Sequence, residues 1–400
     1  MSPEPVDHNN NQQAPEMDLA RYTQDLVERF SQPIAMDVVF WSPPEDPDKP
    51  SLPYLPGFNT TIYAHQVTGT EKPRPYLEDE YLRTATQSEA VVEHPSRFAP
   101  SIAVGTSMAK LVITSCIASG ATKGPQIVAC MITPCQKDGE EPQKSFQAVA
   151  KIYDPLYYSF LESLGRQPRD CVNEADKDYT NEVAAYEQLR RHGQTGSFAP
   201  EYHGSWTFTL PVTVKGNPQR RDIHLVLIEL LNGVSIQDTQ IQNSEDKSKG
   251  LDSFHFPEEY RLEILARAMD GYVKQLKIGL DQRDFAGRNV MLVSDKANPQ
   301  GEEICGLTIP RVVLVDYNIA KVANMSLETR TWLPSNPAAV FWDQCLWEDF
   351  NGWVPNQWQD WKLQQDWLLW RFNGENHRHL YYPSQEFFDQ MLAARTPIDG

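Results

Sequence analysis

Short apolar runs of strand length dominate the middle of the chain. Residues 108–118, 126–132 and 146–153 are rich in valine, isoleucine and alanine, and polar segments with glycine, proline and lysine separate them. This pattern predicts three antiparallel strands joined by turns.

A helix and two further strands are expected next. Residues 178–191 place Val183, Tyr186 and Leu189 on one face of a helix, with Thr180 as a candidate cap. Strands are predicted at 202–210 and 221–231, and the second is almost entirely apolar. It should therefore be central and buried.

The last third of the chain has a more helical pattern. A long helix is predicted over 256–278, with Pro257 at its first position, and short strands are predicted at 289–293 and 311–315. Eight of the ten tryptophans lie between Trp332 and Trp370. Basic residues are sparse around them, which favours helices packing a core over a stacking groove for nucleic acid.

The segment before the first strand is different in character. Residues 1–16 are polar and predict a disordered tail, whereas apolar residues at helical spacing predict a helix over 17–31. Prolines interleaved with aromatics over 42–100 predict extended chain. Docking of this segment on the main body is favoured, although an arm that binds a partner would have the same pattern.

Composition and charge exclude several classes of function. With 40% hydrophobic residues the chain is globular, and its net charge of −18 argues against nucleic acid and anionic membrane surfaces as partners. No apolar run is long enough for a membrane span, and the polar N-terminus predicts a cytoplasmic or nuclear location. The six cysteines have no metal-ligand spacing, which favours reduced structural thiols.

Six polar residues stand beside the predicted strands and helices in a specific order. They are Lys151 in AVAK, Glu182 in NEVAAYEQL, Glu229 in LIELLNG, Asp284 and Asn289 in QRDFAGRN, and Asp316 in LVDYN. Taken singly, Lys151 could be a surface lysine, Glu182 a solvated helix residue and Asp316 a turn former. Together, in this order and spacing, they resemble the protein-kinase-like fold over about residues 108–325.

The resemblance implies a fold class and a domain organisation. The expected fold is α+β and two-lobed, with an N-lobe of antiparallel sheet plus one helix and a mainly helical C-lobe. The disordered tail (1–16) and an N-terminal extension (17–105) would precede the N-lobe (106–231), and the C-lobe (232–400) would end in tryptophan-rich helices.

The resemblance also implies ATP and Mg²⁺ as cofactors and gives each residue a role. Lys151 would contact the α and β phosphates and be held by Glu182. Asp316 and Asn289 would hold Mg²⁺ through oxygen atoms. Asp284 would accept or orient the proton of the attacking hydroxyl.

Other site residues are expected with less specific roles. Arg288 would supply a catalytic cation, as in the RDLAARN version of tyrosine kinases. Glu229 and Leu231, at the end of the apolar strand, would contribute to cofactor binding. Gly120 and Gly124 could cradle phosphates or simply form a hairpin turn, because no GxGxxG motif is present.

The sequence departs from the family in three places. Gln282 replaces the histidine before Arg-Asp, Tyr317-Asn318 replaces Phe-Gly after the metal aspartate, and no Ala-Pro-Glu motif follows. The end of the chain is more similar to the small-molecule branch, the aminoglycoside and choline phosphotransferases, or to kinase-like proteins of filamentous fungi. Whether the hydroxyl acceptor is a protein or a small molecule stays open.

Three functional hypotheses follow. The first is an ATP- and Mg-dependent phosphotransferase that transfers the γ-phosphoryl group to a hydroxyl. The second is a catalytically impaired pseudokinase that acts as a nucleotide-sensing or protein-interaction module. The third, a structural α+β protein with an accidental order of motifs, is the weakest.

Overall fold

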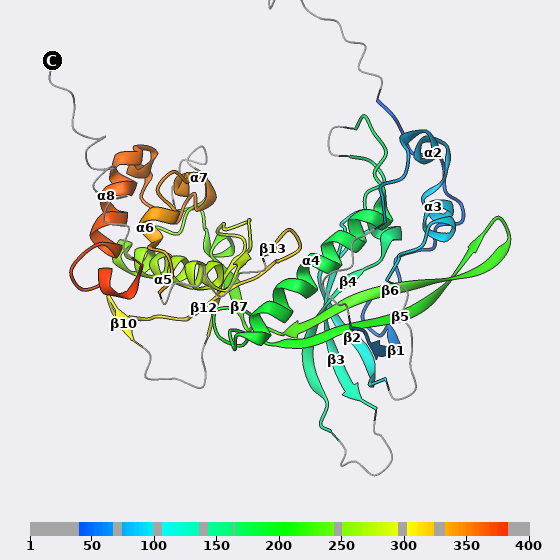
Figure 1. The fold of residues 1–400 in the computed structure, drawn as a ribbon, viewed down its shortest axis with the longest axis horizontal. Coiled ribbons are helices and arrows are strands. Elements are labelled where there is room, and N and C mark those ends of the chain that lie inside the picture. Colours follow the sequence, from blue (N-terminus) through cyan, green and yellow to red (C-terminus); the bar gives the residue numbers. More distant parts are fainter. Residues whose placement is uncertain are drawn as a thin grey trace, which may run out of the picture.

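The computed structural model describes residues 40–66, 74–98, 106–135, 143–162, 165–243, 250–294, 302–323 and 333–382. The predicted tail and the predicted helix over 17–31 lie outside these residues. Figure 1 shows two halves, a strand-rich half and a C-terminal half, with helix α4 (Cys171–Arg191) running between them.

The strand-rich half is a closed antiparallel barrel of six strands. They follow one another around the barrel in the order β1, β2, β3, β4, β6 and β5, and β1 pairs with both β2 and β5. The strands are β1 (Asn59–Ala64), β2 (Met108–Ala118), β3 (Gln126–Pro134), β4 (Phe146–Tyr153), β5 (Tyr202–Val214) and β6 (Asn217–Glu229).

The expectation of a two-lobed kinase-like fold is wrong. Its N-lobe would be an open sheet, but here the sheet closes into a barrel because β1 pairs with both of its outer strands. Its C-lobe would be mainly helical, but within the described residues that half also contains three small sheets. Closure removes the exposed edges of β2 and β5, which an open sheet must protect by other means.

The proline-rich extension supplies the strand that closes the barrel. Gly57, with φ +93°, ends the turn before β1, and its N–H donates to the Ile113 carbonyl over 2.9 Å. Tyr54 is fully buried next to Phe58 and Phe208. The extension is therefore part of the barrel, whereas Phe40 at its start is 70% exposed.

A buried charged cluster lies in the barrel half. The Arg221 guanidinium on β6 contacts the Asp154 carboxylate over 3.0 Å, and Tyr54 donates its hydroxyl hydrogen to the same carboxylate over 2.6 Å. The Leu156 backbone N–H and the Pro211 carbonyl complete the hydrogen bonding. We call Arg221, Asp154 and Tyr54 the barrel cluster.

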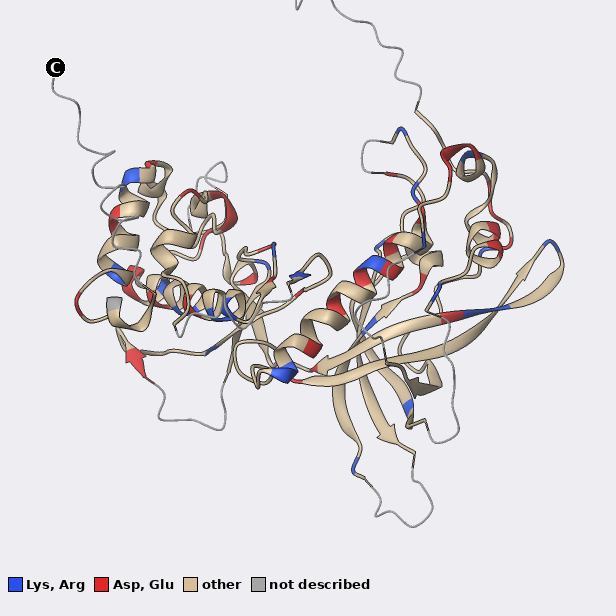
Figure 2. Cartoon of the chain, in the orientation of Figure 1, with Lys and Arg blue, Asp and Glu red and all other residues tan. Residues whose placement is uncertain are grey.

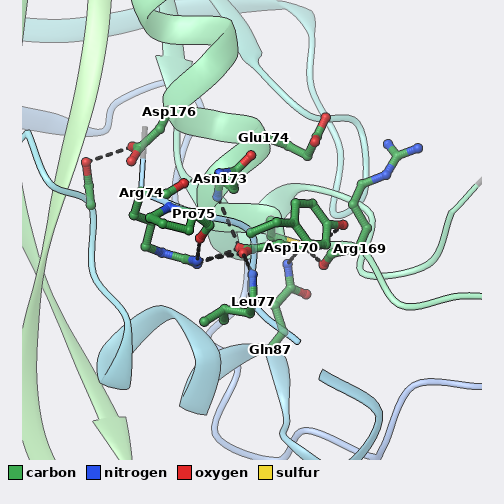
Figure 3. Close-up of polar contacts among 12 residues, drawn as sticks. Arg74, Pro75, Leu77, Gln87, Arg169, Asp170, Asn173, Glu174 and Asp176 are labelled. Atoms are coloured by element: carbon green, nitrogen blue, oxygen red, sulfur yellow. Dashed lines mark hydrogen bonds and ion pairs between the residues drawn. The ribbon is translucent and has the colours of Figure 1, made fainter. Parts of the chain in front are cut away.

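Two short helices of the extension, α2 (Asp79–Thr84) and α3 (Gln87–Glu93), lie near the N-terminal end of α4. Asp170 caps α4 by accepting the Asn173 N–H, and Arg74 clamps Asp170 through two hydrogen bonds of 2.6 Å (Figure 3). The predicted helix over 178–191 is thus seven residues longer at its start, because this cap lies upstream of Thr180.

The C-terminal half combines helices with small sheets. Its longest helix is α5 (Glu258–Lys277), with Pro257 at the N-cap, and it packs against β12 and β8. One sheet has three strands, with β9 (Val290–Val293) between β7 (Gly233–Ser235) and β12 (Arg311–Leu314). A second sheet pairs β8 (Leu280–Asp281) with β13 (Lys321–Val322). A third pairs β10 (Glu303–Ile304) with β11 (Leu307–Thr308). Helices α6 (Pro337–Val340), α7 (Leu346–Asp349) and α8 (Trp361–Phe372) follow.

Most tryptophans of the C-terminal segment pack as the sequence predicted. Trp353 is fully buried and donates its indole N–H to the Arg261 carbonyl over 2.9 Å, and Trp358 packs against Trp367. Trp361 and Trp370 are exceptions, because they are 46% and 72% exposed.

Acidic residues occur on several elements of both halves, including α2, α4 and α7 (Figure 2). Among the described helices, none is long and apolar enough to cross a lipid bilayer.

Candidate functional site

The candidate site lies where the barrel, α4 and the C-terminal half meet. Lys151 stands on β4, whose neighbours β3 and β6 pair with it on both sides. Glu182 stands on α4, and the Lys151 Nζ atom lies 2.7 Å from its Oε2 atom. Both side chains are buried. The helix is thereby tied to the centre of the sheet by one charged hydrogen bond.

Asp316 brings the C-terminal half to the same lysine. It lies two residues after the end of β12, and its Oδ1 atom is 2.8 Å from Lys151 Nζ. The next residue, Tyr317, donates its backbone N–H to Glu182 Oε2 over 3.1 Å. Its hydroxyl receives a hydrogen bond from Gln275 of α5. We call Lys151, Glu182 and Asp316 the interface cluster.

The three charged groups of the interface cluster change one another's pKa. Burial alone would lower the pKa of Lys151, but Asp316 and Glu182 raise it above its usual value. The charge of Lys151 lowers the pKa of Asp316. Burial raises the pKa of Glu182 to about 7, against the opposing charge of Lys151. Asp316 is therefore an ionised carboxylate at neutral pH, and its side chain is 40% exposed.

A loop between β8 and β9 holds the second group of predicted residues. The Asn289 amide donates to the Asp284 carboxylate Oδ2 atom over 2.7 Å and to the Asp284 carbonyl over 2.9 Å. The Arg288 guanidinium bonds the other carboxylate oxygen, Oδ1. The Asp284 side chain is thus fixed by two neighbours while remaining 28% exposed.

Gln282 connects this loop to Asp316, a role that the sequence alone did not indicate. Its buried side chain donates to the carbonyls of Val315 and Asp316 over 3.1 and 2.8 Å, and it accepts the Asp284 N–H over 2.8 Å. Gln282 therefore links the loop between β8 and β9 to the loop that follows β12. Its position directly before Arg-Asp is the signal that could have suggested this role.

Asn181 is a second contributor that the sequence analysis missed. Its amide on α4 donates to the Asn318 carbonyl over 2.8 Å, and it directly precedes Glu182 in the helix. Helix α4 therefore holds the backbone that follows Asp316 at two points.

The loop between β8 and β9 and the loop after β12 each contain a residue with a left-handed backbone conformation. Arg283 has φ +69° and Asp316 has φ +63°, in the left-handed region that residues with a Cβ atom rarely adopt. Such residues cost free energy and are held by the surrounding contacts. Here they lie next to Asp284 and at the end of β12.

Glu229 and Leu231 were predicted to help bind the cofactor. Glu229 is the last residue of β6, the strand that neighbours Lys151, and Leu231 lies two residues beyond it. Glu229 pairs with Ala148 of β4, and its carboxylate is bound by the Arg311 guanidinium over 2.7 and 2.9 Å. The charge of this side chain is therefore already compensated. Leu231 is partly buried in the link to the C-terminal half.

Gly120 and Gly124 lie in the turn between β2 and β3. The Gln126 side chain accepts the Gly120 N–H over 2.8 Å and donates to the carbonyls of Gly120 and Gly124. Gly124 has φ +88°, and its N–H donates to the Tyr157 carbonyl. These contacts are those of a braced hairpin turn, which was one of the two interpretations of these glycines.

The oxygen atoms present fit a magnesium ion. Mg²⁺ takes hard oxygen ligands and is commonly held by one or two protein side chains together with substrate phosphates. Asp316 offers a carboxylate, and the Asn289 amide oxygen accepts no hydrogen bond within the described residues. No group of three or more His, Cys, Asp or Glu residues that could bind a metal alone occurs in the described parts of the chain.

The structure thus brings Lys151, Glu182 and Asp316 into direct contact and joins Asp284, Arg288 and Asn289 in a second group, with Gln282 between the two. The hydrogen bonds of Gly120 and Gly124 described above are with Gln126 and Tyr157, which belong to neither group. No protein-family model matches this chain, and a search of curated proteins finds no significantly similar one.

Proposed function

We propose that the protein is an ATP- and Mg-dependent phosphotransferase that transfers the γ-phosphoryl group to a hydroxyl. One observation carries this proposal: a buried lysine contacts two carboxylates that come from a helix and a loop far apart in the sequence, beside a positioned aspartate. The proposal rests on this arrangement of side chains and not on the kinase fold, which the barrel rules out.

The chemistry of such a site is mostly positioning and charge stabilisation. The acceptor's hydroxyl oxygen forms a bond to the terminal phosphorus of ATP. The bond between that phosphorus and the β,γ-bridging oxygen breaks, and its electron pair leaves with ADP. The hydroxyl proton passes to the Asp284 carboxylate and then to water.

Each residue of the site has a task in this scheme. Lys151 would bind phosphate oxygens, and Glu182 aims the lysine side chain. Asp316 and Asn289 would hold the metal, which supplies positive charge to the phosphate oxygens. Arg288 and Asn289 hold the Asp284 carboxylate in a fixed orientation, so that it can receive a proton from a hydroxyl within hydrogen-bond reach.

A second candidate is a nucleotide-sensing or protein-interaction module without catalysis. The observation that favours it is the hairpin turn at residues 120–124. There the Gln126 side chain accepts a hydrogen bond from the Gly120 N–H and donates to the carbonyls of Gly120 and Gly124. A backbone cradle for phosphates would need free N–H groups at such a turn.

ADP formation separates the two candidates. We expect wild type to form ADP from Mg-ATP, with water as a slow acceptor, and Asp284→Asn to lose this activity by about 10²–10⁴-fold while still binding ATP. Asp343→Asn, at an exposed aspartate away from these contacts, is the control. If wild type binds ATP but forms ADP no faster than Asp284→Asn, the non-catalytic candidate holds instead.

A further inference from the structure

The Arg311–Glu229 ion pair is a second charged contact between the two halves of the molecule. The Arg311 guanidinium, at the start of β12, donates two hydrogen bonds to the Glu229 carboxylate at the end of β6. Among the described residues, this pair and the Lys151–Asp316 pair are the two salt bridges between a barrel strand and residues 311–316. An arginine that bonds a carboxylate through two N–H groups fixes orientation as well as distance.

Backbone carbonyls hold the same guanidinium from another side. Arg311 Nε donates to the Ser197 carbonyl over 2.7 Å, and Arg311 Nη2 donates to the Ala199 carbonyl over 3.2 Å. The other end of β12 is bonded to this segment as well, since the Leu314 N–H donates to the Phe198 carbonyl over 2.7 Å. Strand β12 is thereby fixed at both ends to the residues that lead from α4 into β5.

The two ion pairs connect the same parts of the fold. Lys151 stands on β4, and Glu229 stands on β6, the strand that pairs with β4. Asp316 follows Arg311 by five residues, and residues 312–314 between them are a buried strand. The sheet therefore relates the position of Glu229 to that of Lys151, and β12 relates the position of Arg311 to that of Asp316.

A ligand at the interface cluster competes with the Lys151–Asp316 pair but not with the Arg311–Glu229 pair. The lysine has three N–H donors, and Glu182 and Asp316 already use two of them. A phosphate oxygen would compete with the carboxylates for these donors, and a cation bound by Asp316 would repel the lysine. The contact that joins the halves at the site is thus the one that a ligand weakens.

We propose that Arg311 and Glu229 form a positioning pair, which keeps Asp316 in place beside Lys151 when a ligand weakens the direct contact between them. This inference rests on the proposed function and deepens it, because it names what regulates the distance between the phosphate-binding lysine and the metal-binding aspartate. Arg311 acts through β12 on Asp316, and Glu229 acts through the sheet on Lys151. Both are positioning residues and not catalytic ones.

Hydrogen exchange without nucleotide tests the positioning role. The Tyr317 N–H donates to Glu182, so its exchange rate reports the contact between α4 and the chain after β12. Asp316→Asn weakens the direct ion pair and keeps a residue type that tolerates the left-handed backbone. We expect Arg311→Met to speed Tyr317 exchange by about threefold in wild type and by about tenfold or more in the Asp316→Asn background.

Arg371→Met is the matched control for this comparison. It removes an ion pair with Glu263 of similar exposure, 17% and 19% against 22% and 27% for Arg311 and Glu229. This pair joins α8 to α5 within the C-terminal half. Tyr317 exchange should therefore be unchanged by Arg371→Met in both backgrounds.

ATP binding with and without Mg²⁺ tests the link to the proposed function. Calorimetry on the full-length protein should show that Mg²⁺ raises the ATP affinity of wild type by about tenfold. In Arg311→Met this increment should fall below about threefold, whereas ATP alone should bind as in wild type because Lys151 and Glu182 are unchanged. Arg311→Lys keeps the charge but not the two parallel hydrogen bonds, so it should be intermediate. If Arg311→Met does not fold, Glu229→Gln weakens the same pair from the other side and carries the same predictions.

Failure of this proposal and failure of the proposed function are distinguishable. If wild type binds Mg-ATP but Arg311→Met keeps the full effect of Mg²⁺, the protein has its nucleotide site and the pair does not position it. Tyr317 exchange that responds equally to Arg311→Met and Arg371→Met would also overturn the positioning role. If exchange responds as expected but wild type never binds ATP, the pair fastens two halves of a protein that has no nucleotide site, and its assignment to phosphoryl transfer is wrong.

Discussion

The molecule contains two buried clusters of charged residues with the same kinds of groups and different surroundings. In the barrel cluster, Arg221 and Asp154 are 4% and 0% exposed, and tyrosine and backbone groups complete their hydrogen bonds. In the interface cluster, Lys151 and Glu182 are equally buried, but Asp316 is 40% exposed.

The difference is between a network that is closed within one half and one that opens to solvent. The barrel cluster is closed by residues of one half of the molecule, whereas the interface cluster joins β4, α4 and the loop after β12. Glu182 Oε1 has no hydrogen-bond partner within the described residues, and Asp316 has a left-handed backbone. An incompletely satisfied network that opens to solvent can accept a ligand, and a complete one cannot.

The largest expected effect on stability follows from breaking the barrel cluster. In Arg221→Met the Asp154 carboxylate is left buried without its cation, which should lower the free energy of unfolding by about 3–5 kcal/mol. Urea denaturation measures this change. ATP binding at a temperature where the variant is folded should be unchanged. A loss below about 1 kcal/mol would show that the barrel cluster is not structural.

Lys151→Met is the matched change in the interface cluster. Asp316 can be solvated, and Glu182, with its pKa already raised to about 7 by burial, can take a proton. The loss of stability should therefore be smaller, about 1–2 kcal/mol, while ATP binding is lost. A variant that is as unstable as Arg221→Met and still binds ATP would reverse the roles of the two clusters.

The pH dependence of stability gives a smaller effect. Burial raises the pKa of Glu182 to about 7, whereas an unfolded chain releases this proton near pH 4.3. Between these values the folded state holds a proton that the unfolded state has lost, so this group's contribution to stability falls as the pH rises. Glu182→Gln has no proton to lose.

The stability of Glu182→Gln relative to wild type should increase from about pH 5 to about pH 8, as measured by urea denaturation at each pH. Glu187→Gln, on the same helix but paired at the surface with Arg190, is the control and should remain parallel to wild type. Parallel curves for Glu182→Gln and wild type would contradict the assigned pKa.

The strands of the barrel were predictable where apolar periodicity is strong. The runs at 108–118 and 146–153 are β2 and β4 to the residue. Strand β1 was not predicted, because its six residues follow a proline-rich segment and its partners are distant in sequence. Local patterns show that a strand exists, but not which strand closes a barrel. The two-lobed fold was expected from the order of the polar residues between Lys151 and Asp316, and that order does not show how the sheet closes.

The candidate site was more predictable than the fold that carries it. Lys151 and Asp316 stand at or beside apolar strands, and a polar residue at such a place signals a specific role. Gln282 was not predicted, since its importance comes from reaching two loops at once. The pairing of Arg311 with Glu229 was not predictable either, because 82 positions separate the two residues in the sequence.

The central claim is that the interface cluster is a metal-dependent nucleotide site, and a thermal-shift titration tests it most directly. Wild type, Asp316→Ala and the control Asp343→Ala are titrated with ATP, with and without Mg²⁺. A ligand that binds only the folded state must raise the melting temperature. The account predicts a Mg²⁺-dependent rise in wild type and in the control, and none in Asp316→Ala. No rise in wild type at millimolar ATP, or an equal rise in Asp316→Ala, would contradict it.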